Sequence, residues 1–213
     1  MSLCDCTAGY PLEYCAARFL RQWEQREEAL HASISGAAPS DSIVEALRYF
    51  QVARNFRGLA ENKDQSVSSD IRSALITTRS DKSLASPIAK VEALAQSLEL
   101  KFGQYNLSAA TKLLWLSCRA PIIVYDKRAV RALSKHAHHM AIAGRYAAFT
   151  TAWRSEYEAL ASSIQVAVEN LPRGRLFMPK TSYTDTQLVA LSKQAWFTER
   201  VFDIFLWEVG GDG

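Results

Sequence analysis

The sequence predicts an all-α protein with about eight helices. Apolar residues recur at three- and four-residue intervals along most of the chain, and no two segments alternate apolar and polar residues as paired strands would. The composition, 48% hydrophobic and 22% charged, is that of an ordinary globular protein, and 213 residues can bury a sizeable core. We therefore expect one helical domain over residues 1–213, arranged in two lobes.

Helix start signals precede most of the expected helices in the N-terminal part of the chain. A long first helix is expected over 11–36. Ser42 and Glu45 stand in capping-box spacing at the expected start of the second helix. Ser69 or Asp70 is the expected N-cap of a short third helix.

Two helices joined by a tight turn are expected next. Ser86 is the expected N-cap of the first, Pro87 occupies its first helical position, and Gly103 ends it. The second runs from about Ser108 to Cys118. The apolar segment PIIVY then forms a buried connector, because its proline prevents the helix from continuing.

Asp126 follows this connector and is expected to cap a basic helix, KRAVRALSKHAHHM. The last expected helix opens with Thr184 and Gln187 in capping-box spacing. Its apolar face is wide enough that we expect it in the core, with the following residues buried: Leu188, Leu191, Ala195, Val201, Phe202, Phe205 and Val209.

Positive charge is concentrated in one quarter of the chain. Residues 103–154 contain eight basic residues and one acidic residue, Asp126, and so carry net +7, whereas the whole chain carries net +3. A segment of one charge sign indicates an anionic partner, and a surface helix that is only solvated normally mixes both signs. DNA is the partner that we expect.

The order helix, tight turn, helix, apolar connector with a proline, and aspartate capping a basic helix resembles the helix-hairpin-helix DNA glycosylases, the superfamily of 8-oxoguanine and endonuclease III-like enzymes. The resemblance covers mainly residues 86–140, with 1–85 and 141–213 as packing helices around this core. Val124, Tyr125 and Asp126 match the family motif V-D-T-H-V, whose aspartate is catalytic. The resemblance implies Asp126 as the catalytic carboxylate of a base-excision enzyme.

The sequence departs from the family motif in two places. The hairpin keeps one glycine, Gly103, and lacks the G-V-G turn that approaches a DNA phosphate. Ser108 stands where the family carries its lyase lysine, which excludes a Schiff-base lyase at that position. Lys112 lies four residues on, on the same helix face, so its amine is the remaining candidate for a catalytic or sugar-supporting role.

Each candidate residue has a structural alternative. For Asp126 the alternative is a helix cap, which is compatible with catalysis, and for Lys112 it is a surface lysine. Trp115 and Tyr125 are candidates for a base pocket or for ordinary core positions. The candidate DNA-binding residues, or alternatively a solvated face, are Ser108, Arg119, Lys127, Arg128, Arg131 and Lys135.

The functional expectation is a DNA-binding protein with a DNA-glycosylase-like fold, with base excision by Asp126 as its catalytic form. The alternative is a non-catalytic descendant of the fold that binds DNA or another protein. We expect no cofactor. Whether the chain is an enzyme at all is left open by the sequence.

Four cysteines, Cys4, Cys6, Cys15 and Cys118, are too few and too irregularly spaced to indicate a metal site. The alternative is that the Cys4–Cys6 pair binds metal together with Cys15 or with the histidines of HAHH. No apolar run has the roughly 20 residues of a membrane span, and the N-terminus lacks the pattern of a signal peptide. We therefore expect a cytoplasmic location and no membrane partner.

Overall fold

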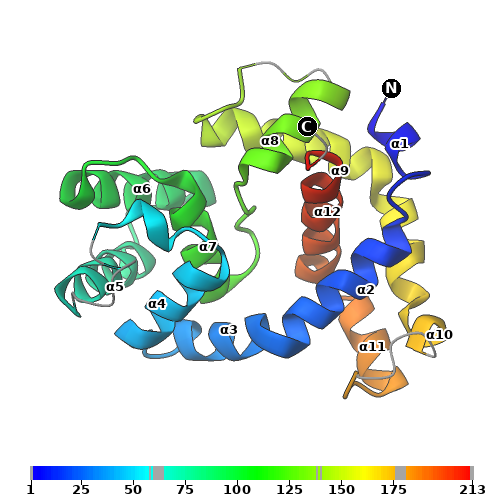
Figure 1. Cartoon of the computed structure of the whole chain (residues 1–213), viewed down its shortest axis with the longest axis horizontal. Coiled ribbons are helices and arrows are strands. Elements are labelled where there is room, and N and C mark those ends of the chain that lie inside the picture. The colour runs from blue at the N-terminus through cyan, green and yellow to red at the C-terminus, as the bar shows by residue number, and fades with distance from the viewer. Residues whose placement is uncertain are drawn as a thin grey trace. The chain divides into compact units, whose positions relative to one another are not determined.

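The structure is a computed structural model that describes residues 2–57, 59, 65–137, 139, 141–175 and 181–211. All regular structure in these residues is helical, which confirms the all-α expectation (Figure 1). The expected number of helices was too low, because the first and the last predicted helices are each divided and two four-residue helices escaped the periodicity analysis. No helix in the described part of the chain combines the length and apolarity needed to cross a membrane.

The chain divides into two compact units. Unit 1 combines both ends of the chain, residues 1–26 and 126–213, whereas unit 2 is the continuous segment 27–125. The segment that resembles the DNA glycosylases, residues 86–140, therefore does not coincide with either unit. Its two helices belong to unit 2, and Asp126 with its basic helix belongs to unit 1.

Unit 2 contains five α-helices and a short 3-10 turn, η2 (Ala53–Asn55). The helices are α3 (Glu28–Ser35), α4 (Ser40–Tyr49), α5 (Gln65–Ser80), α6 (Pro87–Phe102) and α7 (Leu107–Cys118). Helix α7 contacts each of the other four and forms the centre of the unit (Figure 1). Its residues from Leu107 to Ser117 are all buried except Ser108, and these buried residues include the polar Thr111, Lys112 and Ser117.

Two basic side chains bind the carbonyls at helix ends around α7. Arg79 of α5 donates from Nη1 to the carbonyl of Ile34 (2.9 Å) and from Nη2 to that of Gly36 (3.1 Å), at the end of α3. Arg79 also reaches Ser117 Oγ in the last turn of α7 (3.3 Å). His31 Nδ1 lies 2.7 Å from the Leu116 carbonyl, and burial lowers the pKa of His31 while this hydrogen bond opposes the shift. These contacts satisfy carbonyls that have no partner within their own helices.

Two predicted helix starts in unit 2 were wrong. Helix α4 begins at Ser40 after Pro39, and Ser42 bonds Ser33 Oγ (2.7 Å) instead of capping its own helix. Helix α5 is already formed at Gln65, so Ser69 and Asp70 lie inside it. The polar residues around position 65 hid this extension, because a polar first turn carries no apolar periodicity.

Unit 1 contains the remaining helices. They are α1 (Leu3–Cys6), α2 (Leu12–Gln22), α8 (Lys127–His136), α9 (Tyr146–Glu169), α10 (Leu171–Gly174), α11 (Asp185–Ser192) and α12 (Ala195–Val209). The expected first helix is divided by a π-helical turn, η1 (Trp23–Glu27), into α2 and α3. A π turn contains one extra residue per turn and leaves no simple mark in the apolar pattern.

Helix α12 occupies the centre of unit 1, where it contacts α2, α8 and α9 (Figure 1). Val201, Phe202, Phe205 and Val209 are all buried, so the expectation that the C-terminal helix lies in the core is confirmed. The expected burial of two earlier residues was wrong, because Ala195 is exposed and Leu191 is only partly buried. Phe197 and Phe19 of α2 pack with ring centroids 4.9 Å apart. Such aromatic contacts contribute about 0.5–1.5 kcal/mol beyond area burial.

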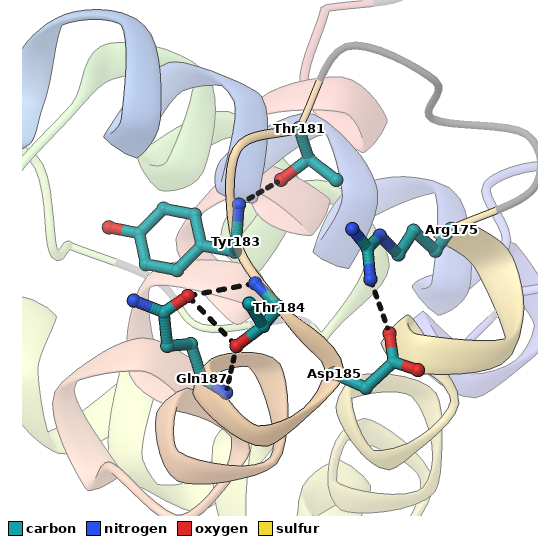
Figure 2. Close-up of polar contacts among 6 residues, drawn as sticks. All are labelled: Arg175, Thr181, Tyr183, Thr184, Asp185 and Gln187. Carbon is teal, nitrogen blue, oxygen red and sulfur yellow. Dashed lines mark hydrogen bonds and ion pairs between the residues drawn. The ribbon is translucent and has the colours of Figure 1, made fainter.

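The expected last helix is divided into α11 and α12. Figure 2 shows the start of α11, where Thr184 Oγ1 accepts a hydrogen bond from the Gln187 backbone N–H (3.3 Å) and Gln187 Oε1 accepts one from the Thr184 backbone N–H (2.8 Å). This is the expected capping box. Arg175 and Asp185 form an exposed ion pair beside it (3.0 Å).

Candidate functional site

The helix pair α6 and α7 forms the expected hairpin within unit 2. Gly103 ends α6 in the left-handed conformation (φ 71°), where a residue with a side chain would be strained. Asn106 caps α7, with its Oδ1 accepting a hydrogen bond from the Ala109 backbone N–H (3.0 Å). Ser86 caps α6 in the same way, through the Ala89 N–H (3.0 Å). The sequence therefore predicted both the turn and its flanking helices correctly.

The turn of this hairpin carries no positive charge of its own. Tyr105 is exposed there, and its pKa is raised by partial burial and by the negative charges of Glu92 and Glu99. Leu100 is 83% exposed, and Lys101 is paired with Asp70 (2.8 Å). These side chains surround the turn with acidic and apolar groups, which gives no support to a phosphate contact at this place.

Ser108 and Lys112 lie at the N-terminal end of α7. Lys112 is only 5% exposed, which rules out the alternative of a surface lysine. Its Nζ donates a hydrogen bond of 2.6 Å to Ser108 Oγ and lies 5.8 Å from the centroid of the Phe50 ring. Ser108 is partly exposed. The position that is a lysine in the resembled family thus holds a hydroxyl bound to a buried amine.

The connector after α7 is buried from Ile122 to Tyr125, as expected. The Tyr125 backbone N–H donates to Thr111 Oγ1 (3.0 Å), which fixes the connector to the middle of α7. Trp115 is 1% exposed and Tyr125 is 8% exposed. Both base-pocket candidates therefore occupy core positions of unit 2.

Asp126 begins the second part of unit 1 and caps α8, as the sequence predicted. Its Oδ1 accepts a hydrogen bond from the Arg128 backbone N–H (2.9 Å), and its side chain is partly exposed. An aspartate in this position satisfies a backbone donor and interacts favourably with the helix dipole. Asp126 belongs to unit 1, whereas Lys112 belongs to unit 2.

A buried carboxylate on α12 lies in the electrostatic neighbourhood of Asp126. Asp203 accepts hydrogen bonds from Trp153 Nε1 (2.8 Å) and from the Arg200 guanidinium (3.1 Å). Burial raises the pKa of Asp203 to about 6 despite the Arg200 charge, and the negative charge of Asp126 adds to the rise. The sequence analysis missed Asp203 because it stands in a strongly apolar helix segment, VFDIFLW, where a lone carboxylate is itself the signal of a buried partner.

Glu199 lies one turn before Asp203 on the same helix. Burial raises its pKa to about 7, the Asp203 charge raises it further, and Arg154 acts in the opposite direction. Glu199 and Asp203 are thus two carboxyl groups of unit 1 whose pKa values are raised by burial.

The four basic residues of α8 that were predicted to bind DNA differ in their environments. Lys127 and Lys135 are exposed. The Arg128 guanidinium stacks on the Trp207 ring (3.8 Å to the centroid), and Arg131 Nη1 donates to the Gly210 carbonyl at the end of α12 (3.1 Å). Arg128 and Arg131 therefore contribute to the packing of unit 1.

Backbone packing reinforces this contact between α8 and α12. A Cβ atom on Gly210 would lie 1.9 Å from the Arg128 carbonyl oxygen, so only glycine permits the approach.

In unit 2, Arg119 is partly buried, and its pKa is lowered by burial while Glu28 opposes the shift.

The described cysteines and histidines do not form a metal site. No group of three potential ligands is found among the described residues, and His138 lies outside them. Cys6 Sγ lies 3.6 Å from His136 Nδ1, and burial and the Asp5 charge raise the pKa of the Cys6 thiol. Cys4 and Cys118 are exposed, whereas Cys15 is buried.

Comparison with known proteins gives no relative for this chain, because no family model, no curated protein and no solved structure matches it.

The raised pKa of Glu199 predicts how the stability of the protein changes with pH. Its pKa in the folded protein, about 7, lies above the ordinary value of 4.5, so the folded state binds more protons than the unfolded state between these values. The free energy of unfolding should therefore fall as pH rises from 4.5 to 7. Glu199→Gln should flatten this fall and stabilise the protein at pH 8 by about 1–2 kcal/mol, allowing for partial exposure.

Urea unfolding of both proteins at a series of pH values measures this difference. Glu158→Gln, an exposed position on α9, is the matched control and should leave the pH profile unchanged. Identical profiles for wild type and Glu199→Gln would contradict the assigned environment of Glu199.

Proposed function

We propose that the chain binds duplex DNA through α8 of unit 1 and that it is a glycosylase-like protein in which Asp126 is the residue for base excision. The observation that carries the proposal is the aspartate-capped basic helix that follows the α6–α7 hairpin and its buried connector. Within α8, Lys127, Arg131 and Lys135 recur at four-residue intervals, so they share one side of the helix. No acidic residue follows Asp126 in this helix.

The lysines and the arginines of α8 have different roles in the proposed binding. Lys127 and Lys135 are exposed and suit phosphate contacts, which position a protein on a duplex without reading its sequence. Arg128 and Arg131 bind Trp207 and the end of α12, so they hold the helix that presents the lysines. Binding of this kind depends strongly on salt, because each phosphate contact releases counterions.

Asp126 is the residue on which catalysis would depend. Its carboxylate is partly exposed at the start of α8, where it can face a nucleotide extruded from the duplex. A carboxylate there orients a water or stabilises the positive charge that develops on the sugar during cleavage of the N-glycosidic bond. The capping hydrogen bond to the Arg128 N–H uses Oδ1 and fixes the side-chain orientation.

The non-catalytic alternative is favoured by two observations in unit 2. Ser108, at the position of the family lysine, is bonded to a buried amine, and the hairpin turn is surrounded by acidic and apolar groups. A protein that kept the helix-capping aspartate but lost the hairpin contact would bind DNA without excising a base.

Salt dependence tests the DNA contact. Lys127→Gln combined with Lys135→Gln removes two exposed charges, so affinity for duplex DNA should fall by similar factors on unrelated sequences. The slope of log affinity against log salt should flatten by about 1.8, or about 0.9 for each phosphate contact. Fluorescence anisotropy with two unrelated duplexes at several salt concentrations measures both quantities.

The matched control replaces two exposed lysines elsewhere, Lys82→Gln with Lys193→Gln, which leaves the net charge equal to that of the test variant. The control should keep the wild-type slope. Equal slopes for wild type and the α8 variant, or no wild-type binding at low salt, would contradict the proposal.

Asp126→Asn separates catalysis from capping. Asparagine caps a helix as well as aspartate does, so the melting temperature should change little, whereas excision should be lost because the amide carries no negative charge. A panel of duplexes with damaged, mismatched or normal bases, followed by alkaline strand cleavage, measures excision. Excision that persists in the variant would contradict the role of Asp126, and a wild type that binds DNA without excising any base would establish the non-catalytic alternative.

A further inference from the structure

Three contacts determine how α8 packs on α12. The Arg128 guanidinium lies 3.8 Å from the centroid of the Trp207 ring, and Arg131 Nη1 donates to the Gly210 carbonyl (3.1 Å). The Gly210 backbone also approaches the Arg128 carbonyl so closely that a Cβ atom would not fit between them. The first turns of α8 therefore lie against the second half of α12.

This contact brings together two carboxyl groups from distant parts of the chain. Asp126 precedes Arg128 by two residues, and Asp203 precedes Trp207 by four, which places Asp203 and Trp207 on the same face of α12. The two carboxylates interact electrostatically, because the negative charge of Asp126 contributes to the raised pKa of Asp203. Asp203 is therefore part of the surroundings of the residue proposed for base excision.

Asp203 is held in place and does not itself face a ligand. Its side chain is buried, Oδ1 accepts a hydrogen bond from Trp153 Nε1 (2.8 Å), and Oδ2 accepts one from Arg200 Nη1 (3.1 Å). Burial raises the pKa of Asp203 to about 6, so the group changes its charge close to neutral pH. Any effect of Asp203 on a reaction must therefore pass through its charge and its neighbours.

The helices α2, α8, α9 and α11 pack against α12, so their charges also bear on Asp203. The charged groups of α12 and its neighbours that act on the two buried carboxyl groups, or that form ion pairs, include Arg18, Asp126, Arg154, Asp185, Glu199, Arg200 and Glu208. Arg18 and Asp185 are each engaged in an ion pair of their own. The charge of Asp203 is thus set mainly by Arg200 and Asp126, with Glu199 as its neighbour on α12.

We propose that Asp203 is a positioning residue for base excision, whose negative charge allows Asp126 to stabilise the positive charge that develops on the sugar. This role rests on the proposed function and deepens it by adding a second carboxylate. When Asp203 is ionised, it balances the positive charge of Arg200. When Asp203 binds a proton, it no longer balances Arg200, whose charge then opposes a cation that develops beside Asp126.

Asp203 forms and breaks no bond in this reaction. The bond between the sugar C1′ atom and the base nitrogen breaks, and its electron pair leaves with the base. The resulting positive charge is shared by C1′ and the ring oxygen of the sugar. Water then adds to C1′, and the proton that it loses neutralises the departing base. Excision should therefore slow as the pH falls through the pKa of Asp203, about 6.

The indole N–H of Trp153 reports the charge of Asp203, because it donates directly to Oδ1. In ¹H–¹⁵N spectra of the full chain, this indole resonance should titrate with a midpoint at about pH 6. Asp126→Asn removes a charge that raises the pKa of Asp203, so the midpoint should move to lower pH. Asp185→Asn removes a carboxylate in the first turn of α11, and this matched control should leave the midpoint unchanged.

Single-turnover excision measures the effect on the reaction. The wild-type rate should rise with pH through the same midpoint as the Trp153 resonance. Asp203→Asn keeps an oxygen for the Trp153 N–H but carries no charge, so it should slow excision about tenfold on the alkaline side of this midpoint. The rise with pH should also disappear in this variant. A purely structural role would not change the pH profile of the folded protein, and circular dichroism shows whether the variant folds.

Equal Trp153 midpoints in wild type and Asp126→Asn would overturn the role of Asp203, as would a wild-type excision rate or pH profile in folded Asp203→Asn. If Asp203→Asn does not fold, the Trp153 titrations and the wild-type pH profile decide, and a profile without the midpoint overturns the role. These results leave Asp126 as the residue for excision. A wild type that excises no base would instead overturn the catalytic form of the proposed function together with the role of Asp203.

Discussion

Each unit depends on the burial of one helix on nearly every side, α7 in unit 2 and α12 in unit 1. Both helices bury most of their side chains, and other helices surround each one (Figure 1). Burial of a single large apolar side chain contributes about 1.5–3 kcal/mol. The net stability of a domain is only about 5–15 kcal/mol, so these two helices dominate the balance.

The same constraint makes the few polar side chains of the central helices informative. A buried charge is costly unless it is paired, so Lys112 on α7 and Asp203 on α12 persist only with specific partners. Lys112 has Ser108 Oγ, and Asp203 has Trp153 and Arg200. In unit 1, the negative charge of Asp126, the residue proposed for base excision, contributes to the raised pKa of Asp203.

Local signals made much of this structure predictable. Gly103, Ser86, Asp126 and the Thr184 capping box act through neighbouring backbone groups, so sequence spacing alone identifies them. Contacts between distant residues leave no such mark. The stacking of Arg128 on Trp207 was therefore not foreseen, nor was the burial of Lys112 against Ser108, although their spacing placed both on one helix face.

Native-state amide hydrogen exchange tests most directly whether α7 and α12 are the centres of their units. The backbone amides of Leu113–Ser117 and Val201–Leu206 should exchange only when the corresponding unit unfolds, and therefore more slowly than any others in that unit. Their exchange should speed up with denaturant as steeply as global unfolding does. Exchange in α7 as fast as in α5, or in α12 as fast as on the exposed face of α9, would contradict this account of the fold.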